Sequence, residues 1–402
     1  MKAKNYLGRR KFIRESSVLG LGVSLMPSFF SSGMKINNLS KPNIGLIGCG
    51  SRGMGLARIL DSTSNINFIS CCDIFPEKTN EVKKLDQNIE AFSEYEELIS
   101  DKNIDGVVIA TPLHLHFPMV KYALEAGKHV YVEKTMAYSI EETLEIEKLV
   151  NKYGKILQVG HQYRYFDMYY QIKKAIDEGW IGKVLHYESQ YHRNADWRRP
   201  VPDPKLEKTI NWRMYREFSG GLMAELAAHQ IDVVNLLVGA PPMKVNGFGG
   251  IDYWKDGRET YDNVRAIYEY DGGIKSNVSS ILTNGYNGYL IRILGTDGTM
   301  VVNRSKTTIY REPVTREIGT VDGVTGATIP MDSNTEGEVL EYDDGGKAPT
   351  EHALEQFSVS ITEGKLPASN ITTGKETAIA VHMANEAMRT ETTQYWDKVV
   401  KL

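Results

Sequence analysis

One short segment, residues 43–60, constrains the fold more than any other part of the chain. The apolar run from Asn43 to Ile47 predicts a strand, and Met54 to Leu60 has the composition of a helix. Between them lies a G-x-G-x-x-G pattern, which reads Gly48-Cys49-Gly50-Ser51-Arg52-Gly53. In this position the first glycine allows a tight turn, the second admits a pyrophosphate and the third lets helix and strand pack closely. The helix N-terminus then presents free N–H groups to phosphates, so the segment predicts a dinucleotide-binding turn.

The same alternation of strand and helix continues to residue 160. Predicted strands cover residues 43–47, 68–72, 106–110, 129–132 and 156–159. Strands that alternate with helices at this spacing form parallel βαβ units. The chain therefore predicts an α/β Rossmann domain over residues 42–160.

After Gly160 the pattern changes. Strand-like runs from residue 245 to residue 294 are separated by turns at Asp271-Gly272-Gly273 and Asn284-Gly285, which favour antiparallel hairpins. Helices are expected near residues 352–363 and 374–389, whereas residues 313–349 are polar and glycine-rich and give no clear structure. Residues 161–402 are therefore predicted to form a second, α+β domain.

The carboxyl edge of the first sheet carries the candidate cofactor contacts. Asp73 closes the second strand, where an acid bonds the ribose 2′-OH and repels a 2′-phosphate, so NAD is favoured over NADP. The simpler interpretation is a helix-capping aspartate after a glycine turn. All six residues of the glycine pattern are candidates, and the others are Asp73, Thr111, Pro112, His116, Glu133, Lys134 and Gln162. His116 is equally well explained as a cap or a core hydrogen-bonding residue.

Lys134 is the candidate general base. It ends the fourth strand, beside the expected nicotinamide, where partial desolvation and the positive ring would lower the pKa of the lysine towards neutrality. The alternative is a surface lysine paired with Glu133. His229 is predicted to support proton transfer, with Glu225 orienting the histidine.

Residues 222–237 are predicted to form a helix that begins after Gly220-Gly221, and Glu225, His229 and Asp232 recur on it at helical spacing. Such a stripe suits proton transfer and hydroxyl recognition. It also suggests a metal site, but the H-E-x-x-H pattern is missing and no cysteine is near, so no metal is predicted. A buried histidine satisfied by its neighbours is the simpler alternative.

The loop that runs from His192 to Arg199 combines donors, an acid and an aromatic ring, as carbohydrate sites do. A solvated loop, or one that packs on a partner subunit, remains the alternative. The predicted substrate contacts are Lys134, Arg164, His192, Trp197, Arg198, His229 and Asp232.

The N-terminus predicts export. Gly8-Arg9-Arg10-Lys11-Phe12-Ile13 is a twin-arginine pattern, and an apolar run and small residues follow. Residues 1–33 are therefore interpreted as a twin-arginine signal of a periplasmic protein, with an uncleaved membrane anchor as the alternative. Three cysteines form no disulfide framework, and a net charge of −4 with scattered basic residues gives no reason to expect nucleic acid.

Together these motifs resemble the Gfo/Idh/MocA (glucose–fructose oxidoreductase / inositol dehydrogenase) family. Its glycine fingerprint is matched by Gly48 to Gly53, its T-P-x-x-x-H element by Thr111 to His116, its A-G-K-H-V-x-x-E-K stretch by Ala126 to Lys134, and its D-x-x-x-H pair by Glu225 and His229. The resemblance implies a second domain with a large open, mostly antiparallel sheet, and a homo-oligomer, either dimer or tetramer. Two departures are Thr135 where proline is usual and Glu225 where aspartate is usual.

Two activities follow from the resemblance. The first is an NAD-dependent dehydrogenase that acts on a hydroxyl of a sugar, glycoside or polyol. The second is a redox-neutral glycosidase, in which transient oxidation permits elimination and the hydride then returns. An exported enzyme lacks a free NAD pool, which favours a tightly held cofactor in both cases. A non-catalytic sensor ranks third.

Overall fold

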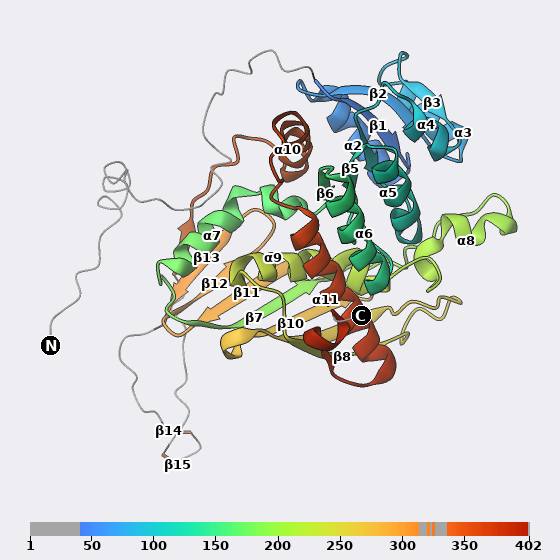
Figure 1. Ribbon diagram of the computed structural model, residues 1–402. Coiled ribbons are helices and arrows are strands. Elements are labelled where there is room, and N and C mark those ends of the chain that lie inside the picture. Colours follow the sequence, from blue (N-terminus) through green and yellow to red (C-terminus); the bar gives the residue numbers. More distant parts are fainter. Residues whose placement is uncertain (1–40, 313–319, 322–323, 326–335, 401–402) are drawn as a thin grey trace, which may run out of the picture. The chain divides into compact units, whose positions relative to one another are not determined.

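The computed structural model describes residues 41–312, 320–321, 324–325 and 336–400 (Figure 1). The predicted signal over residues 1–33 lies outside this range. The described chain forms two large sheets, the helices that cover them and one small hairpin. The two large sheets agree with the sequence prediction. None of the described helices is long and apolar enough to cross a membrane.

The first sheet has six parallel strands in the order β3-β2-β1-β4-β5-β6. The strands are β1 (Asn43–Ile47), β2 (Asn67–Cys72), β3 (Glu90–Phe92), β4 (Gly106–Ile109), β5 (His129–Val132) and β6 (Leu157–Val159). The short strand β3 is the one that the sequence pattern misses. Strand order reverses between β1 and β4, and ligands of doubly wound sheets bind in the crevice at that point.

Helices cover both faces of this sheet, as Figure 1 shows. They are α2 (Ser51–Ser62), α3 (Pro76–Lys83), α4 (Tyr95–Ser100), α5 (His116–Glu125) and α6 (Ile140–Tyr153). A helix from late in the chain, α10 (Pro349–Glu363), also packs here, because Leu354 and Phe357 join the core beneath α2. A segment near the C-terminus therefore packs against the first sheet.

The second sheet has nine strands in the order β16-β13-β12-β11-β7-β10-β9-β8-β17, and all neighbours are antiparallel except β7 and β10. The strands are β7 (Val184–Tyr191), β8 (Lys244–Gly250), β9 (Asn263–Glu269), β10 (Lys275–Ile281), β11 (Tyr289–Gly295), β12 (Gly298–Val302), β13 (Thr307–Arg311), β16 (Glu338–Leu340) and β17 (Gln394–Tyr395). A separate hairpin is formed by β14 (Thr320–Val321) and β15 (Val324–Thr325).

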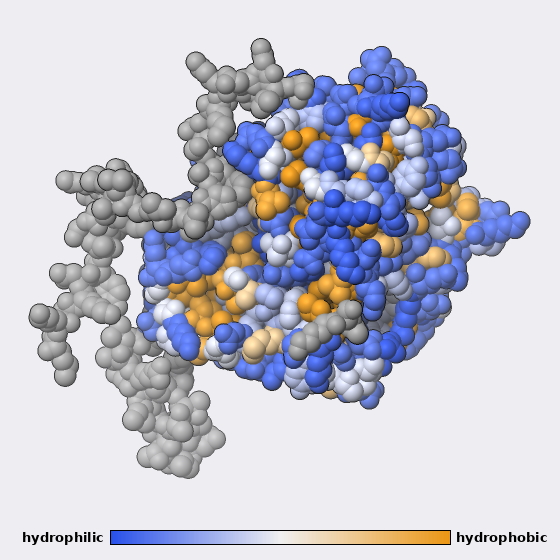
Figure 2. Space-filling view, viewed as in Figure 1, coloured by the Kyte–Doolittle hydropathy of each residue, from blue (hydrophilic) through white to orange (hydrophobic). Residues whose placement is uncertain are grey.

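Helices cover one face of the second sheet. These helices are α7 (Asp167–Asp177), α9 (Ala228–Val238) and α11 (Ile371–Thr390), and side chains alternate between buried and exposed along β8, β9 and β10 (Figure 1). Apolar Phe248 and Ile267 are exposed on the uncovered face. On the face drawn in Figure 2, hydrophilic residues predominate and apolar ones form separate patches.

The connection from β7 to α9 is the part that shapes the site. It contains the short helices η3 (Pro204–Leu206), α8 (Glu207–Ile210) and η4 (Trp212–Met214). A π-helical turn, η5 (Met223–Ala227), then leads directly into α9. The helical pattern of the sequence predicts one regular helix here, and the π turn is the difference.

Candidate active site

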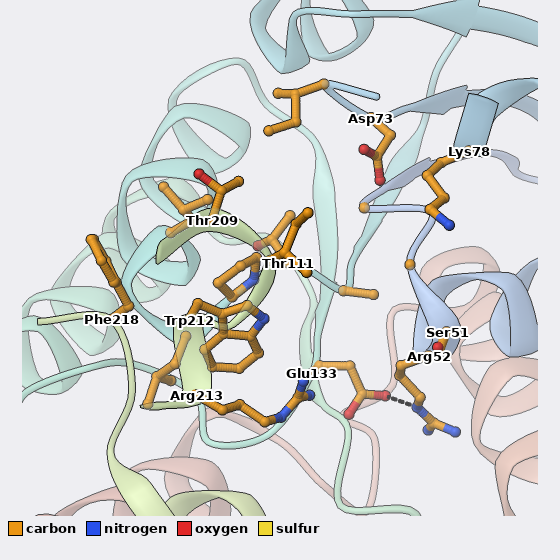
Figure 3. A pocket seen from close by; sticks show the side chains of 18 of the residues that line it. Ser51, Arg52, Asp73, Lys78, Thr111, Glu133, Thr209, Trp212, Arg213 and Phe218 are labelled. Carbon is orange, nitrogen blue, oxygen red and sulfur yellow. Dashed lines mark hydrogen bonds and ion pairs between the residues drawn. The ribbon is translucent and has the colours of Figure 1, made fainter. Parts of the chain in front are cut away.

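A cleft of about 1220 Å³ opens at the carboxyl edge of the first sheet. One wall comes from the loops after β1, β2, β4 and β5, and the other from the β7–α9 connection and η5 (Figure 3). Pockets for single small molecules are usually about 300–1000 Å³, so this cleft has room for a dinucleotide with a small substrate.

The glycine turn has the shape that a pyrophosphate needs. Gly48 has a φ of +90°, and a Cβ there would lie 2.8 Å from the Ala110 carbonyl oxygen. A Cβ on Gly53 would lie 1.8 Å from the Gly48 carbonyl oxygen, whereas one on Gly50 would meet nothing within 4 Å. The first and third positions are therefore closed by packing, and the second is open to a ligand.

Asp73 lies in the cleft at the end of β2 (Figure 3). Its Oδ2 accepts from the Cys49 backbone N–H at 2.7 Å, and its Oδ1 accepts from the Phe75 backbone N–H at 3.0 Å. The carboxylate thus holds the glycine turn and the start of α3 in place, and both oxygens keep a lone pair for a ribose hydroxyl. The predicted cofactor role and the simpler capping role are compatible here.

Arg52 and Glu133 connect the glycine turn to the end of β5. Arg52 Nε donates to Glu133 Oε1 at 2.7 Å (Figure 3). Glu133 therefore pairs with Arg52, not with Lys134 as in the surface-lysine alternative. The peptide bond between Lys134 and Thr135 is cis, at the position where Thr135 replaces the usual proline.

Lys134 reaches across the cleft into the second domain. Its Nζ donates to the carbonyl oxygens of Ala224, at 3.1 Å, and Glu225, at 2.9 Å, both in the π turn. A neutral amine has two N–H groups, so these two acceptors leave its lone pair free to face the cleft. π turns occur frequently at functional sites.

The ionisable groups around Lys134 shift one another's pKa values. Burial lowers the pKa of Lys134 below its ordinary value, although Glu225 and Glu133 oppose the shift. Burial raises the pKa of the Glu225 carboxyl, but Arg213 and Lys134 outweigh it and the pKa falls. Burial, with Lys134 and His161, holds the pKa of His229 well below its usual range, so its imidazole is neutral.

His229 lines the cleft, but Glu225 does not orient it. Glu225 Oε2 accepts from Arg213 Nε at 2.7 Å, and His229 Nδ1 has no hydrogen-bond partner among the described residues. The π turn is the physical reason, since its extra residue rotates Glu225 away from the face that a regular helix gives it.

His116 is a structural bridge. Its Nδ1 lies 2.9 Å from the Thr135 carbonyl oxygen and its Nε2 lies 3.1 Å from the Thr111 carbonyl oxygen. The buried ring therefore joins the loops after β4 and β5, and this geometry favours the hydrogen-bonding role over direct cofactor contact.

Of four predicted substrate residues, Arg164, Arg198 and Asp232 do not line the cleft, and Trp197 does. Arg164 and Asp232 are buried in an ion pair with each other, Nε to Oδ1 at 2.8 Å, and do not line the cleft. Arg198 pairs with Glu207 and Asp256 and does not line the cleft. Trp197 does line the cleft, with a φ of +64°, which is uncommon outside glycine.

His192 and Cys49 also lie outside the cleft lining. His192 Nε2 is 3.0 Å from Ser279 Oγ, in a shallow hollow on the uncovered face of the second sheet. The Cys49 side chain is buried and points into the core, so only its backbone serves the glycine turn. Its neighbour Arg193, in contrast, lines the cleft.

Four residues of the β7–α9 connection line the cleft although they are not among the predicted substrate contacts. Arg193 and Arg199 lie in the loop predicted to bind sugar, whereas Trp212 and Arg213 lie beyond it. The Arg213 guanidinium lies 4.2 Å from the centre of the Trp212 ring, and Figure 3 draws both side chains among those that line the cleft. Their only sequence signal is the density of arginine and tryptophan in a polar loop.

The residues of the cleft fit NAD. Gln162 lines it, and the side-chain Oε1 of Gln162 is buried without a partner. The cleft therefore offers two acceptors, the Asp73 carboxylate and Gln162 Oε1. The backbone at Gly50 leaves open space that a pyrophosphate can approach. Among the described residues, no cluster of three or more histidine, cysteine or acidic side chains could hold a metal ion.

Comparison with known proteins agrees with this geometry. The sequence model of the protein family described as "Oxidoreductase family, NAD-binding Rossmann fold" matches residues 42–161. The family model described as "GFO/IDH/MocA C-terminal domain" matches residues 169–301. The two matches follow one another along the chain in the order of the two sheets.

Curated relatives match over part of their length. The scyllo-inositol 2-dehydrogenase (NAD(+)) of Bacillus subtilis is 30% identical over 210 residues, which cover 51% of this chain and 57% of the relative. The 2,7-anhydro-N-acetylneuraminate hydratase of Mediterraneibacter gnavus is 32% identical over 206 residues, 51% of each chain. The chain thus spans between half and three-fifths of the length of these relatives.

Solved structures share the fold. A levoglucosan dehydrogenase in complex with NADH and levoglucosan superposes with a TM-score of 0.69 at 23% identity, over 88% of this chain and 99% of that one. An aldose–aldose oxidoreductase from Caulobacter crescentus gives 0.71 at 18% identity, over the same shares. With both domains matched in order, the chain belongs to the Gfo/Idh/MocA oxidoreductase family and carries its NAD-binding Rossmann domain.

Proposed function

We propose that the protein is an NAD-dependent dehydrogenase that oxidises a hydroxyl of a sugar, glycoside or polyol. NAD, when bound, supplies the hydride acceptor. The carrying observation is the position of the Lys134 Nζ, which spans the cleft to two carbonyl acceptors and keeps its lone pair for the substrate hydroxyl. Relatives that are dehydrogenases of inositol and levoglucosan support this substrate class.

Lys134 takes the hydroxyl proton in this proposal, and burial favours its neutral amine because it lowers the pKa of the lysine. His229 lies in the same cleft with Nδ1 unpartnered, so it hydrogen-bonds the substrate and supports proton transfer. Glu225 acts on Lys134 through its charge, since it raises the pKa that burial lowers.

A tightly held cofactor forms part of the proposal. Arg199, from the second domain, donates from Nη2 to Ser51 Oγ at 3.4 Å, directly over the first turn of α2. Buried Asn211 fixes the Arg199 backbone, because it accepts from the Arg199 N–H and donates to the Arg199 carbonyl oxygen. A guanidinium held at this point would bond the pyrophosphate from the side opposite the glycine turn.

The second candidate is redox-neutral cleavage of a glycoside or anhydro bond with the same residues. The observation that favours it is the presence of two hydratases of 2,7-anhydro-N-acetylneuraminate among the relatives, at 32% and 30% identity. In that case the hydride returns to the substrate, and no reduced cofactor accumulates.

The test is to purify the protein, release its cofactor by denaturation and identify it, then screen sugars against the loaded protein. A dehydrogenase gives one reduced nicotinamide per oxidised sugar, and redox-neutral cleavage gives product without it. Protein that carries no NAD and takes up none would contradict both functions. Comparing Lys134→Ala, His229→Ala and the double variant adds a second check, because two groups of one relay give less than additive losses.

Location and assembly are further proposals. We infer export through the twin-arginine route from residues 1–33, and an assembly of identical chains from the uncovered face of the second sheet. Lysine at positions 9 and 10 would trap precursor in the cytoplasm if the first proposal is right. Light scattering of the purified protein tests the second.

A further inference from the structure

Two exposed arginines converge on one tyrosine whose ring lies near that of His229. Arg193 Nη2 donates to the Tyr191 hydroxyl oxygen at 3.0 Å, and Arg304 Nη2 donates to the same oxygen at 2.6 Å. The guanidinium carbons lie 4.9 and 5.4 Å from the centre of the Tyr191 ring. The phenol thus brings together two positive charges, one from the loop that follows β7 and one from the β12–β13 turn.

Neither charge is paired with an acid among the residues that the structure describes. Within the described part of the chain, no carboxylate lies within ion-pair distance of Arg193 or Arg304, whereas Arg52, Arg164, Arg198 and Arg213 all have acidic partners. Like charges that meet without an acid repel each other, and an anion between them would remove the repulsion. Each guanidinium also keeps several N–H donors that the tyrosine does not use.

The pair lies close to the proposed reaction centre. Arg193 lines the cleft together with Lys134 and His229. The Tyr191 ring is 6.0 Å from the His229 ring, so the Arg193 guanidinium carbon is at most about 11 Å from the centre of the His229 ring. A hexose ring with its exocyclic carbon, plus a hydrogen bond of about 3 Å at each end, covers such a distance.

We propose that Arg193 and Arg304 bind an anionic group carried by the sugar, so that the substrate class is acidic sugars. The proposal rests on the proposed function for the position of the reacting carbon, and it adds the chemistry at the far end of the substrate. A carboxylate and a sulfate ester offer the same oxygens to a guanidinium pair, and they are separated by experiment.

Contacts with the protein hold the Arg193 side chain in place, which favours binding of an anion. The Arg193 backbone N–H donates to the Ile281 carbonyl oxygen, and its guanidinium stacks on the Tyr191 ring, which is itself buried. Less rotamer freedom is therefore lost when the side chain meets an anion than for a free surface arginine.

The test measures binding of D-glucuronate, D-glucose 6-sulfate and D-glucose to the NAD-loaded protein by calorimetry. At least one anionic sugar should bind about 10- to 100-fold more tightly than glucose, the range of a charge-assisted hydrogen-bond pair. Arg193→Gln and Arg304→Gln should each reduce this preference, and Arg193→Lys should keep part of it. Arg58→Gln, an exposed arginine on α2, is the matched control and should change nothing.

The outcomes separate this proposal from the proposed function. If glucose binds as tightly as both anionic sugars, or if none of the three binds, the acidic-sugar proposal is wrong. If neutral sugars reduce the cofactor and anionic ones do not, the dehydrogenase stands and the acidic-sugar proposal falls. If anionic sugars bind through the arginines but reduced nicotinamide never forms, the substrate class stands and net oxidation is rejected.

Discussion

Beside α2 the cleft wall is built within the first domain around one short turn, whereas beside η5 it is built by contacts between the two domains. The glycine turn is closed by Gly48 and Gly53, five residues apart, and by β4. Lys134 instead depends on carbonyls about 90 residues away, in a turn whose acid is held by Arg213. The first half is therefore shaped by local packing, and the second by the way the two domains meet.

This difference predicts that changes beside η5 alter the rate, and changes beside α2 alter cofactor binding. The largest expected effect is that of Lys134→Ala. Loss of a positioned acid–base group costs about 10²- to 10⁴-fold in kcat, while bound NAD should be retained because the glycine turn is untouched. Steady-state kinetics and cofactor content measure the two effects, with exposed Lys148→Ala on α6 as the control. Activity within a few-fold of the unchanged protein would remove Lys134 from the mechanism.

Gly53→Ala should act in the opposite way. Its Cβ would lie 1.8 Å from the Gly48 carbonyl oxygen, so the turn must open. We expect the free energy of unfolding to fall by about 1–3 kcal/mol, and NAD binding to weaken by a similar free energy. Gly55→Ala, in the same helix with nothing within 4 Å of its Cβ, should instead stabilise by up to about 1 kcal/mol. Thermal unfolding and NAD titration compare the pair, and equal behaviour would show that the close approach at Gly53 is unimportant.

Arg199 links the two halves and sharpens the comparison. Arg199→Gln should speed NAD dissociation by about 10-fold or more, as one charge-assisted hydrogen bond is lost, with little effect on stability. The dissociation rate is measured by chasing bound NAD with excess labelled NAD, again with Arg58→Gln as the control. An unchanged rate would place the Arg199 side chain away from the pyrophosphate.

Glu225→Gln should shift the pH dependence without abolishing activity. Lys134 must be neutral to act as a base, so activity rises as pH increases through the pKa of Lys134. Glu225 raises that pKa, and its loss also leaves Arg213 unpaired, so both changes move the rising limb to lower pH. A profile of kcat/KM against pH tests the sign. A shift to higher pH would contradict the proposed electrostatics.

The sequence predicts the α2 half of the cleft well and the η5 half poorly, because only the first depends on local sequence patterns. The Rossmann strands and the glycine turn follow from local patterns, and the predicted positions of β1, β2, β4 and β5 agree with the structure within a residue or two. The π turn has no such pattern, because residues 222–237 read as one regular helix, and Glu225 consequently pairs with Arg213 instead of His229. Arg164 and Asp232 carry charges that suit a substrate, yet only the fold reveals that they neutralise each other.

The smallest expected effect is at His192, where the composition of the loop suggests sugar binding and the structure places the side chain elsewhere. His192 contacts Ser279 on the uncovered face of the second sheet, and it shares that hollow with Glu188, Arg265 and Asn277. His192→Ala should therefore leave kcat/KM within about twofold, as for most surface changes.

Trp197→Ala, five residues along in the same loop but inside the cleft, should raise KM, because an aromatic face is lost. Kinetics and light scattering should be read together. Loss of activity in His192→Ala with the assembly intact would mean that the substrate half of the cleft extends to this face, whereas a change in mass alone would identify the hollow as part of a contact between chains.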